Sequence, residues 1–169
     1  MVFVKYFILF LILVSSTLIG KFLSNKYIYR LEELEDVKNS LNILKTKIKF
    51  TYEPIPEVFG EIAENVNSNI SRLFLLAKHN MEKMSAGEAF EEAVDNFTCN
   101  LKLEDKKVIK MLSKLLGRTD VEGQISQIEV TEEFLENQIK EAEEEKKKNE
   151  RLYTRLGTVI GLTIVIILA

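Results

Sequence analysis

Residues 30–52 read RLEELEDVKNSLNILKTKIKFTY, and this stretch carries one apolar stripe along a single helix. Its apolar residues recur at steps of three and four, the spacing that places side chains on one face of an α-helix. The positions of the stripe are Leu31, Leu34, Val37 or Lys38, Leu41, Leu44 and Ile48. Pro54 and Pro56 follow, and proline cannot donate to the helical hydrogen-bond ladder. We therefore predict a long helix that runs to about Tyr52.

The chain before this helix is apolar, without a charge between Lys5 and Lys21. With the flanks that lysine side chains can reach across, it attains the ~20 residues that a helix needs to span hydrocarbon. We predict a transmembrane helix over residues 1–23. A secretory signal peptide, cleaved near Val14-Ser-Ser, is the alternative reading of the same segment.

The other end of the chain, residues 156–169, is also free of charge and is shorter. Fourteen helical residues rise only ~21 Å against a hydrocarbon core of ~30 Å. Tyr153 at the interface, or local thinning of the bilayer, would make up the difference. A buried helix end is the alternative, but so small a chain has little else to cover such an apolar rod. We predict a second transmembrane helix here.

Basic residues flank both apolar ends on their inner sides. Lys21, Lys26 and Arg30 follow the first, and residues 146–155 bring a further basic cluster before the second. The positive-inside rule then places the middle of the chain in the cytoplasm and both termini on the far side of the cell membrane.

Between the two ends the composition favours helix, with Leu, Ile, Glu and Lys abundant and two prolines. The predicted fold is all-α: a membrane-anchored helical bundle, with two long antiparallel stalk helices and a cap of about four shorter helices. The predicted cytoplasmic domain covers residues 24–155 and divides into a stalk at 24–52, a cap at 54–117 and a return stalk at 120–155. Large apolar residues of the cap can form a core, namely Phe59, Phe74, Phe90 and Phe97.

Local signals mark where the cap helices begin and end. Asn67-Ser-Asn69 breaks the chain before a helix that extends to Met81, and Ser85 with Glu88 three residues later predicts a capping box. A further helix is expected over Leu103–Leu116, ended by Gly117 in a left-handed conformation. Asp120 then opens the last helix.

The last helix carries a repeat of three- and four-residue steps up to the second apolar end. Its members are Ile125, Ile128, Glu132, Leu135, Ile139, Ala142, Lys146, Asn149, Tyr153 and Leu156. Glu132, Lys146 and Asn149 are polar, so we expect at most a weak coiled coil.

The sequence offers little that could perform catalysis. His79 is the one histidine and has no Cys or His at ligand spacing, so neither a metal nor a cofactor is expected. Cys99 is the one cysteine, which excludes an internal disulfide. A net charge of −3 without a basic stripe argues against nucleic acid. We expect a protein that is no enzyme and that acts by binding other proteins.

Two segments resemble a known family. Arg30-Leu-Glu-Glu-Leu with the stripe after it and Pro54-Ile-Pro56, and later Leu112–Asp120 with Gln124 and Ile128, resemble stage III sporulation protein AB of endospore-forming bacteria. The resemblance covers essentially the whole chain. That family is in turn similar to the helical cytoplasmic domain of type II secretion and type IV pilus platform proteins. Those proteins share a start of the Gly-x-x-x-x-Ala type, which resembles Gly87 to Ala93 of this chain, where five residues stand between the two.

The resemblance implies a place in the channel complex between mother cell and forespore. The helical domain would lie in the mother-cell cytoplasm and dock a hexameric secretion-type ATPase, similar to stage III sporulation protein AA. Other channel membrane proteins, membrane lipid and a second copy of the chain are further expected partners. The platform proteins have two helical domains and this chain has one, so their stoichiometry does not transfer.

Acidic helix faces are the candidate partner-binding surfaces, and their members are Glu91, Glu92, Asp95, Glu132, Glu133 and Glu136. Solubility alone also explains charged helix faces. A tethered scaffold that self-assembles through its stalks without an ATPase is the competing function, and an enzyme would need a site around His79 that the sequence does not supply.

Overall fold

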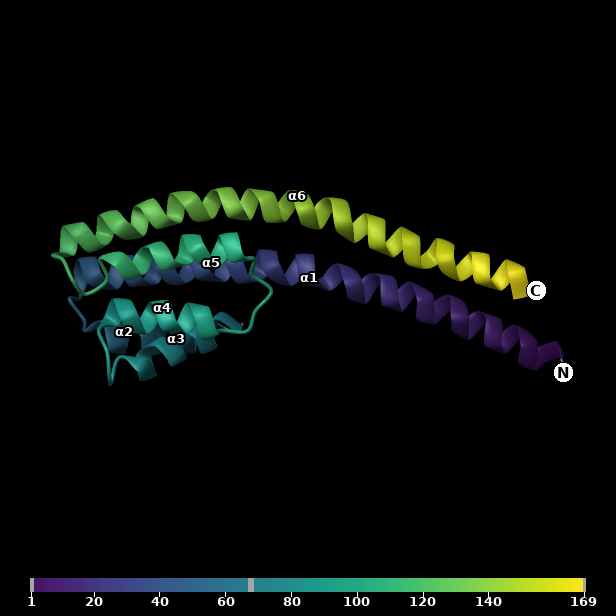
Figure 1. The fold of residues 1–169 in the computed structure, drawn as a ribbon, viewed down its shortest axis with the longest axis horizontal. Coiled ribbons are helices and arrows are strands. Elements are labelled where there is room, and N and C mark those ends of the chain that lie inside the picture. The colour runs from purple at the N-terminus through teal and green to yellow at the C-terminus, as the bar shows by residue number, and fades with distance from the viewer. Residues whose placement is uncertain (1, 67–68, 169) are drawn as a thin grey trace. The chain divides into compact units, whose positions relative to one another are not determined.

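The computed structural model describes residues 2–66 and 69–168, and these residues form helices without any strand. Two long helices, α1 (Val2–Phe50) and α6 (Val121–Leu168), begin and end the chain. Between them lie α2 (Ile55–Asn65), α3 (Asn69–Asn80), α4 (Ala86–Asn96), α5 (Leu103–Lys110) and the short 3₁₀ helix η1 (Met111–Lys114) (Figure 1). The predicted all-α class is confirmed, and so are the two long apolar helices at the ends of the chain.

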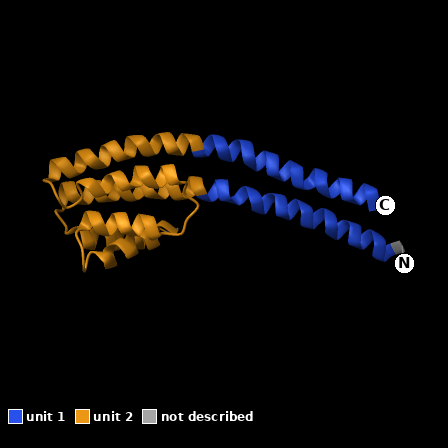
Figure 2. Cartoon of the chain, viewed as in Figure 1, with its two compact units in different colours: residues 1–29, 142–169 blue, residues 30–141 orange. Residues whose placement is uncertain are grey.

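The chain divides into two compact units, each of which contains a part of α1 and a part of α6 (Figure 2). Unit 1 comprises residues 1–29 and 142–169, and unit 2 comprises residues 30–141. The boundaries lie inside the stretch 24–155 that we assigned from the sequence to one cytoplasmic domain.

Unit 1 is a pair of helices that pack through small residues. A Cβ atom added to Gly20 would lie 2.5 Å from the carbonyl oxygen of Tyr153 and 3.1 Å from the Cα of Gly157. Ser16 Oγ donates a hydrogen bond of 2.6 Å to the carbonyl oxygen of Gly157. Such close backbone approach is typical of helix pairs in membranes, where small side chains take the place of a hydrophobic driving force. The two segments are antiparallel, because Gly161 meets Leu13.

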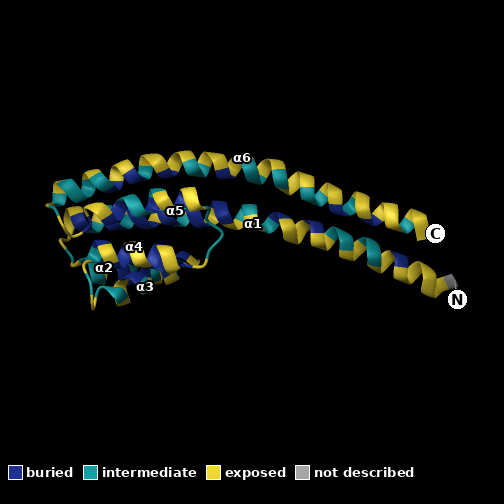
Figure 3. Ribbon diagram, in the orientation of Figure 1, coloured by how far each residue is buried: buried dark blue, intermediate teal, exposed yellow. Residues whose placement is uncertain are grey.

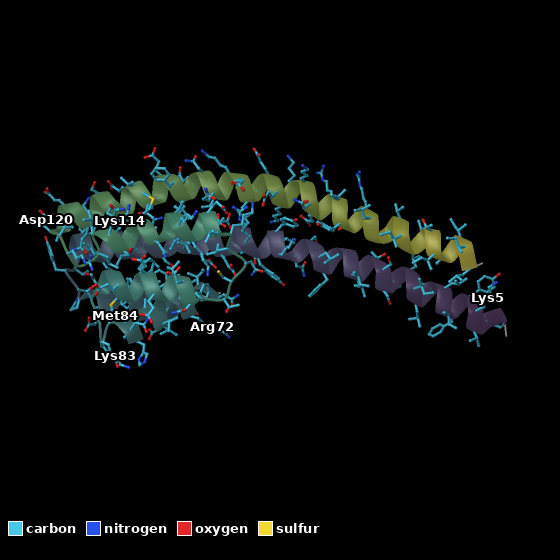
Figure 4. All side chains as sticks on the ribbon, viewed as in Figure 1. Lys5, Arg72, Lys83, Met84, Lys114 and Asp120 are labelled. Carbon is cyan, nitrogen blue, oxygen red and sulfur yellow. The ribbon has the colours of Figure 1, made fainter. Side chains whose placement is uncertain are left out.

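The apolar side chains of unit 1 are mostly exposed (Figure 3). The most apolar window is 17% buried in α1 and 11% buried in α6, and each helix is long enough to cross a bilayer. Exposure of an apolar surface of this size to water is unfavourable in free energy. The two terminal helices therefore indicate that the protein associates with a membrane.

Unit 2 is a helical bundle with an aromatic core. Phe59, Phe74 and Phe90 are fully buried and contact one another, with ring centroids 5.0 Å apart for Phe59 and Phe74 in an edge-to-face geometry. Phe97 lies at the edge of this core and is 8% exposed. The stripe of α1 supplies Leu34, Leu41 and the other apolar residues predicted for it, all buried. The predicted core is thus confirmed.

Several of the local signals that mark helix boundaries are confirmed. Ser85 and Glu88 form a capping box at the start of α4, and Pro56 lies in the first turn of α2. Gly117 has a φ of +69°, and Asp120 accepts a hydrogen bond of 2.9 Å from the amide of Gly123 at the start of α6. The break predicted at 67–69 falls mainly on residues outside the described part of the chain.

The end of α1 differs slightly from the prediction. The helix ends at Phe50, and Tyr52 adopts a left-handed conformation with a φ of 54°. The amides of Thr51 and Tyr52 both donate to the carbonyl oxygen of Lys47, at 3.0 and 3.2 Å. The chain thus closes the helix with a left-handed residue, a role usually taken by glycine. Similarly, α3 ends at Asn80, which leaves Met81 in a turn and only partly buried.

The helix predicted over Leu103–Leu116 is wrong in its second half, which is the 3₁₀ helix η1. Side chains satisfy backbone carbonyls there that a continued α-helix would use: Gln127 Nε2 donates to Met111 O at 2.9 Å, and Ser113 Oγ donates to Lys110 O at 2.7 Å. The carbonyl of Ser113 then lies against Gly87 of α4. Hydrogen bonds from side chains to backbone carbonyls compete with α-helix geometry.

Gly87 is therefore required by packing, because a Cβ atom there would collide with the carbonyl oxygen of Ser113. We expect Gly87→Ala to destabilise unit 2 by about 1–3 kcal/mol, the usual cost of overpacking against backbone. The matched control is Gly60→Ala in α2, where the added Cβ would meet only the mobile end of Lys78. That change should be neutral or stabilising, since alanine favours helix. Urea unfolding followed by circular dichroism compares the two, and equal losses would contradict the packing role of Gly87.

Candidate protein-interaction site

A buried ionic cluster holds α1 and α5 together at the start of unit 2. Arg30 Nε donates to Asp105 Oδ2 and Arg30 Nη2 donates to Asp105 Oδ1, both at 2.8 Å. The two side chains are 3% and 0% exposed. Asp105 also accepts a hydrogen bond of 2.8 Å from the amide of Lys102. One carboxylate thus pairs with a cation of α1 and caps the first turn of α5.

A second buried carboxylate, Glu33, fixes the connection between α4 and α5. It accepts hydrogen bonds from the backbone and side-chain amides of Asn100, at 2.7 and 2.8 Å, and from Asn69 Nδ2 at 3.2 Å. Three donors on one carboxylate offset the cost of its burial. Glu33 and the Arg30–Asp105 pair therefore shape unit 2 and leave little charge for a partner to contact.

The acidic residues predicted on α4 are largely engaged within the molecule. Lys110 Nζ lies 2.7 Å from Asp95 and 3.4 Å from Glu91. The hydrogen bond that Lys110 donates to Asp95 is the largest cause that raises the pKa of Lys110 above its ordinary value. Glu92 is exposed, and no hydrogen bond or ion pair to it is seen among the described residues.

The acidic residues predicted on α6 divide between two faces of the helix. Glu132 was expected to be exposed, but its side chain is only 12% exposed and forms an ion pair with Lys45 of α1. Glu136 pairs with Lys38 at 2.8 Å, and this hydrogen bond lowers the pKa of Glu136 below its ordinary value. Both pairs join α6 to α1. Glu133 points to the other side, where it is exposed and has no ion-pair partner among the described residues.

The outer face of α6 also carries exposed apolar side chains that the sequence analysis missed. Val130 is 40% exposed and Phe134 is 47% exposed. They stand four residues apart, so they lie on the same side of the helix. Glu133 and Asn137 are exposed on the same face. We call these four residues the α6 outer face.

The sequence does contain a signal for this face. The buried residues of α6 in unit 2 are Ile128, Thr131 and Leu135, and of these Ile128 and Leu135 are members of the predicted repeat. Val130 and Phe134 are large apolar residues that fall off that repeat. An apolar pair on the polar side of an amphipathic helix is a sign of a binding surface.

No feature of a reaction centre is visible in the described residues. Residues 2–66 and 69–168 contain no group of three or more His, Cys, Asp and Glu side chains that could hold a metal ion. His79 is exposed and lies 3.5 Å from Glu82 on the surface of α3. Cys99 is partly buried, and this burial raises the pKa of its thiol.

The sequence of the chain matches one protein family along almost its whole length. The family is described as stage III sporulation protein AB, and the match covers residues 5–169. The chain belongs to this family. A curated relative, stage III sporulation protein AB of Bacillus subtilis (strain 168), is 26% identical over 161 residues, which cover 93% of this chain and 94% of the relative. The resemblance inferred from the sequence is thus confirmed.

A solved structure shares the fold. A chain of stage III sporulation protein AB superimposes with a TM-score of 0.66 at 23% identity, covering 70% of this chain and 96% of the solved one. The family description names a stage of sporulation and no reaction.

Proposed function

We propose that this protein is a membrane platform of a sporulation channel complex, and that unit 2 docks a hexameric secretion-type ATPase. Membership of the stage III sporulation protein AB family supports the role in sporulation. The basic residues beside both apolar ends support a cytoplasmic unit 2, with the termini across the mother-cell membrane that faces the forespore. A hexameric ATPase in the same compartment could then reach unit 2.

The α6 outer face is the observation that carries the docking proposal. It combines an exposed aromatic ring, Phe134, with the carboxylate of Glu133, which has no ion-pair partner in the described part of the chain. Aromatic residues are frequent among the anchors of protein interfaces. Unit 2 has 15 Lys and Arg against 22 Asp and Glu, a net charge of −7. Such a surface fits a partner with a basic patch around an apolar pocket. Glu92, on the surface of α4, is a second acidic residue that remains available.

The test is co-purification of the full-length chain, in detergent, with the stage III sporulation protein AA-like ATPase of the same organism. We expect the unchanged chain to retain the ATPase. Phe134→Asp and Glu133→Lys should each reduce the retained amount by about tenfold or more, as truncation of an interface anchor does. Leu75→Asp is the matched control, since Leu75 is an apolar residue of α3 that is 51% exposed.

Failure of the unchanged chain to retain the ATPase, with both proteins abundant, would contradict the proposal. Equal loss with Leu75→Asp would remove the assignment to the α6 outer face. Stable oligomers of the chain that form without the ATPase, together with normal sporulation of the Glu133→Lys variant, would support a self-assembling scaffold instead.

A further inference from the structure

Unit 1 carries a dense group of cations beside its apolar segments. Residues 21–29 contain two lysines and no acid, and residues 146–155 contain five Lys and Arg with Glu150 as their one acid. All of unit 1 has eight Lys and Arg against four Glu, a net charge of +4, whereas unit 2 has −7. The positive charge of the protein is therefore concentrated at the ends of the apolar helices.

The antiparallel register of unit 1 brings cations of α1 and α6 to the same levels. Gly20 packs on Gly157, and the rings of Tyr27 and Tyr153 stack with centroids 6.0 Å apart. Residue numbers of facing positions thus sum to about 174–180, which places Lys21 near the level of Arg155 and Lys26 near that of Arg151. At 1.5 Å per residue the two levels are about 7.5 Å apart. We call these four residues the basic collar.

The collar differs from several cations of unit 2 in having no acidic partner among the described residues. Its four side chains are all exposed, and no ion pair to them is seen in the described parts of the chain. The ammonium of Lys26 lies 4.9 Å from the centre of the Tyr27 ring. In unit 2, by contrast, Lys38, Lys45 and Lys110 each pair with a carboxylate. The collar charges are thus free to meet anions from outside the chain.

The surroundings of the collar identify the anion. Phe22, next to Lys21, is 76% exposed, and Leu156, next to Arg155, is 45% exposed. Exposed apolar side chains beside the charges, together with the Tyr27–Tyr153 pair at the level of the collar, match the boundary between acyl chains and headgroups, where tyrosines and cations are enriched. A phosphodiester lies at this depth on every phospholipid, and anionic lipids add a net negative charge.

We propose that the basic collar binds the headgroups of anionic phospholipids, so that the helix pair selects these lipids for its boundary layer. The inference rests on the insertion of unit 1 in the membrane, which is one part of the proposed function, and not on the docking of an ATPase. Each cation near an anionic surface contributes about a fivefold preference, and some of this is lost to competition among lipids and salt.

The test uses the full-length chain in bilayers of phosphatidylcholine mixed with phosphatidylglycerol. The chain has no tryptophan, so Phe22→Trp introduces one fluorophore at the collar. Quenching by brominated phosphatidylglycerol is compared with quenching by brominated phosphatidylcholine at equal fractions. We expect brominated phosphatidylglycerol to quench the tryptophan at least about five times as effectively as brominated phosphatidylcholine. The ratio of the two quenching efficiencies should fall towards one in high salt.

A fourfold variant should reduce the ratio of anionic to zwitterionic lipid at the collar to about one. It carries the substitutions Lys21→Gln, Lys26→Gln, Arg151→Gln and Arg155→Gln. Double variants of one level, Lys21 with Arg155 or Lys26 with Arg151, should each retain part of the preference and protect the test against loss of folding. The matched control neutralises four exposed cations of unit 2, namely Lys78, Lys83, Lys114 and Lys140, and should keep the full preference.

Addition of inorganic phosphate shows whether the ligand of the collar is a lipid headgroup or a free anion. It should reduce the preference no more than sodium chloride of the same ionic strength, because the proposed ligand is held in the bilayer. A stronger effect of phosphate would indicate a site for the free ion and overturn the proposal. So would equal quenching by the two lipids, or a preference that survives in the fourfold variant. None of these outcomes bears on ATPase retention, which is measured separately in detergent.

Discussion

Replacement of Arg30 by alanine is expected to destabilise unit 2 by about 3–5 kcal/mol, because it leaves the fully buried carboxylate of Asp105 without its cation. Such a loss is a large fraction of the 5–15 kcal/mol that stabilises a typical domain. Two bonds of 2.8 Å between Arg30 and Asp105 disappear together, while the hydrogen bond from Lys102 alone does not neutralise the charge. Urea unfolding of the full-length chain in detergent, followed by circular dichroism, measures the change.

Two further variants show whether the loss of stability comes from the burial of the ion pair or only from the removal of a charge. Lys38→Ala removes a cation from the exposed pair with Glu136 and should leave the unfolding midpoint nearly unchanged. The paired change Arg30→Met with Asp105→Leu should recover much of the loss, since no buried charge remains, although the cap on α5 is still missing. If Arg30→Ala were no more harmful than Lys38→Ala, the buried pair would not be a main support of unit 2.

Gly157→Leu is expected to separate the two helices of unit 1. A Cβ atom at residue 157 would lie 2.7 Å from the carbonyl oxygen of Ser16 and 3.1 Å from the Cα of Gly20. Both are backbone atoms, which cannot relieve the clash by a change of rotamer. Overpacking of this kind costs about 1–3 kcal/mol, which shifts the pairing equilibrium by roughly five- to 150-fold. The larger leucine side chain also prevents the hydrogen bond from Ser16 Oγ to the carbonyl of Gly157.

Crosslinking in the membrane measures this separation. Tyr27→Cys and Tyr153→Cys replace two stacked rings, and Cys99→Ser removes the native thiol. A short bismaleimide should join residues 27 and 153 in this background, and Gly157→Leu should abolish the product. Val159→Leu adds a similar volume at a position that is 58% exposed and should leave the crosslink intact. An undiminished crosslink with Gly157→Leu would contradict the small-residue packing.

Features that depend on neighbours in the sequence were predictable. The apolar stripe of α1, the capping box at Ser85 and Glu88 and the left-handed Gly117 each follow from residues within one or two helical turns. The large apolar residues of the cap were also recognised as its core. These features decide the fold class, because an apolar stripe must be buried against another element and the sequence predicts only helices.

Features that depend on tertiary contacts were not predictable. Arg30 was noted only as part of a basic flank and of a family motif, and nothing nearby in the chain indicates that it meets Asp105, which is 75 residues away. The switch from α5 to η1 depends on Gln127, a residue of another helix. Glu132 looked like its neighbour Glu133, but the packing of α6 on α1 brings Glu132 to Lys45 and leaves Glu133 exposed.

The candidate docking surface shows the same limit. Charge alone suggested six acidic residues, and the structure places four of them in ion pairs with Lys38, Lys45 and Lys110. The exposed pair Val130 and Phe134 could have been found from the sequence, by asking which apolar residues of the last helix fall off its repeat. They were missed because the candidate surfaces were chosen only for their acidic residues.

The central claim is that both ends of the chain enter the membrane and hold unit 2 in the cytoplasm. Labelling of single cysteines with a membrane-impermeant maleimide tests it most directly, in cells without walls that express the chain in a Cys99→Ser background. Phe3→Cys, at a residue that is 91% exposed, should react from outside, whereas Ser126→Cys on unit 2 should react only after the membrane is broken. A reactive Ser126→Cys in intact cells would contradict the account.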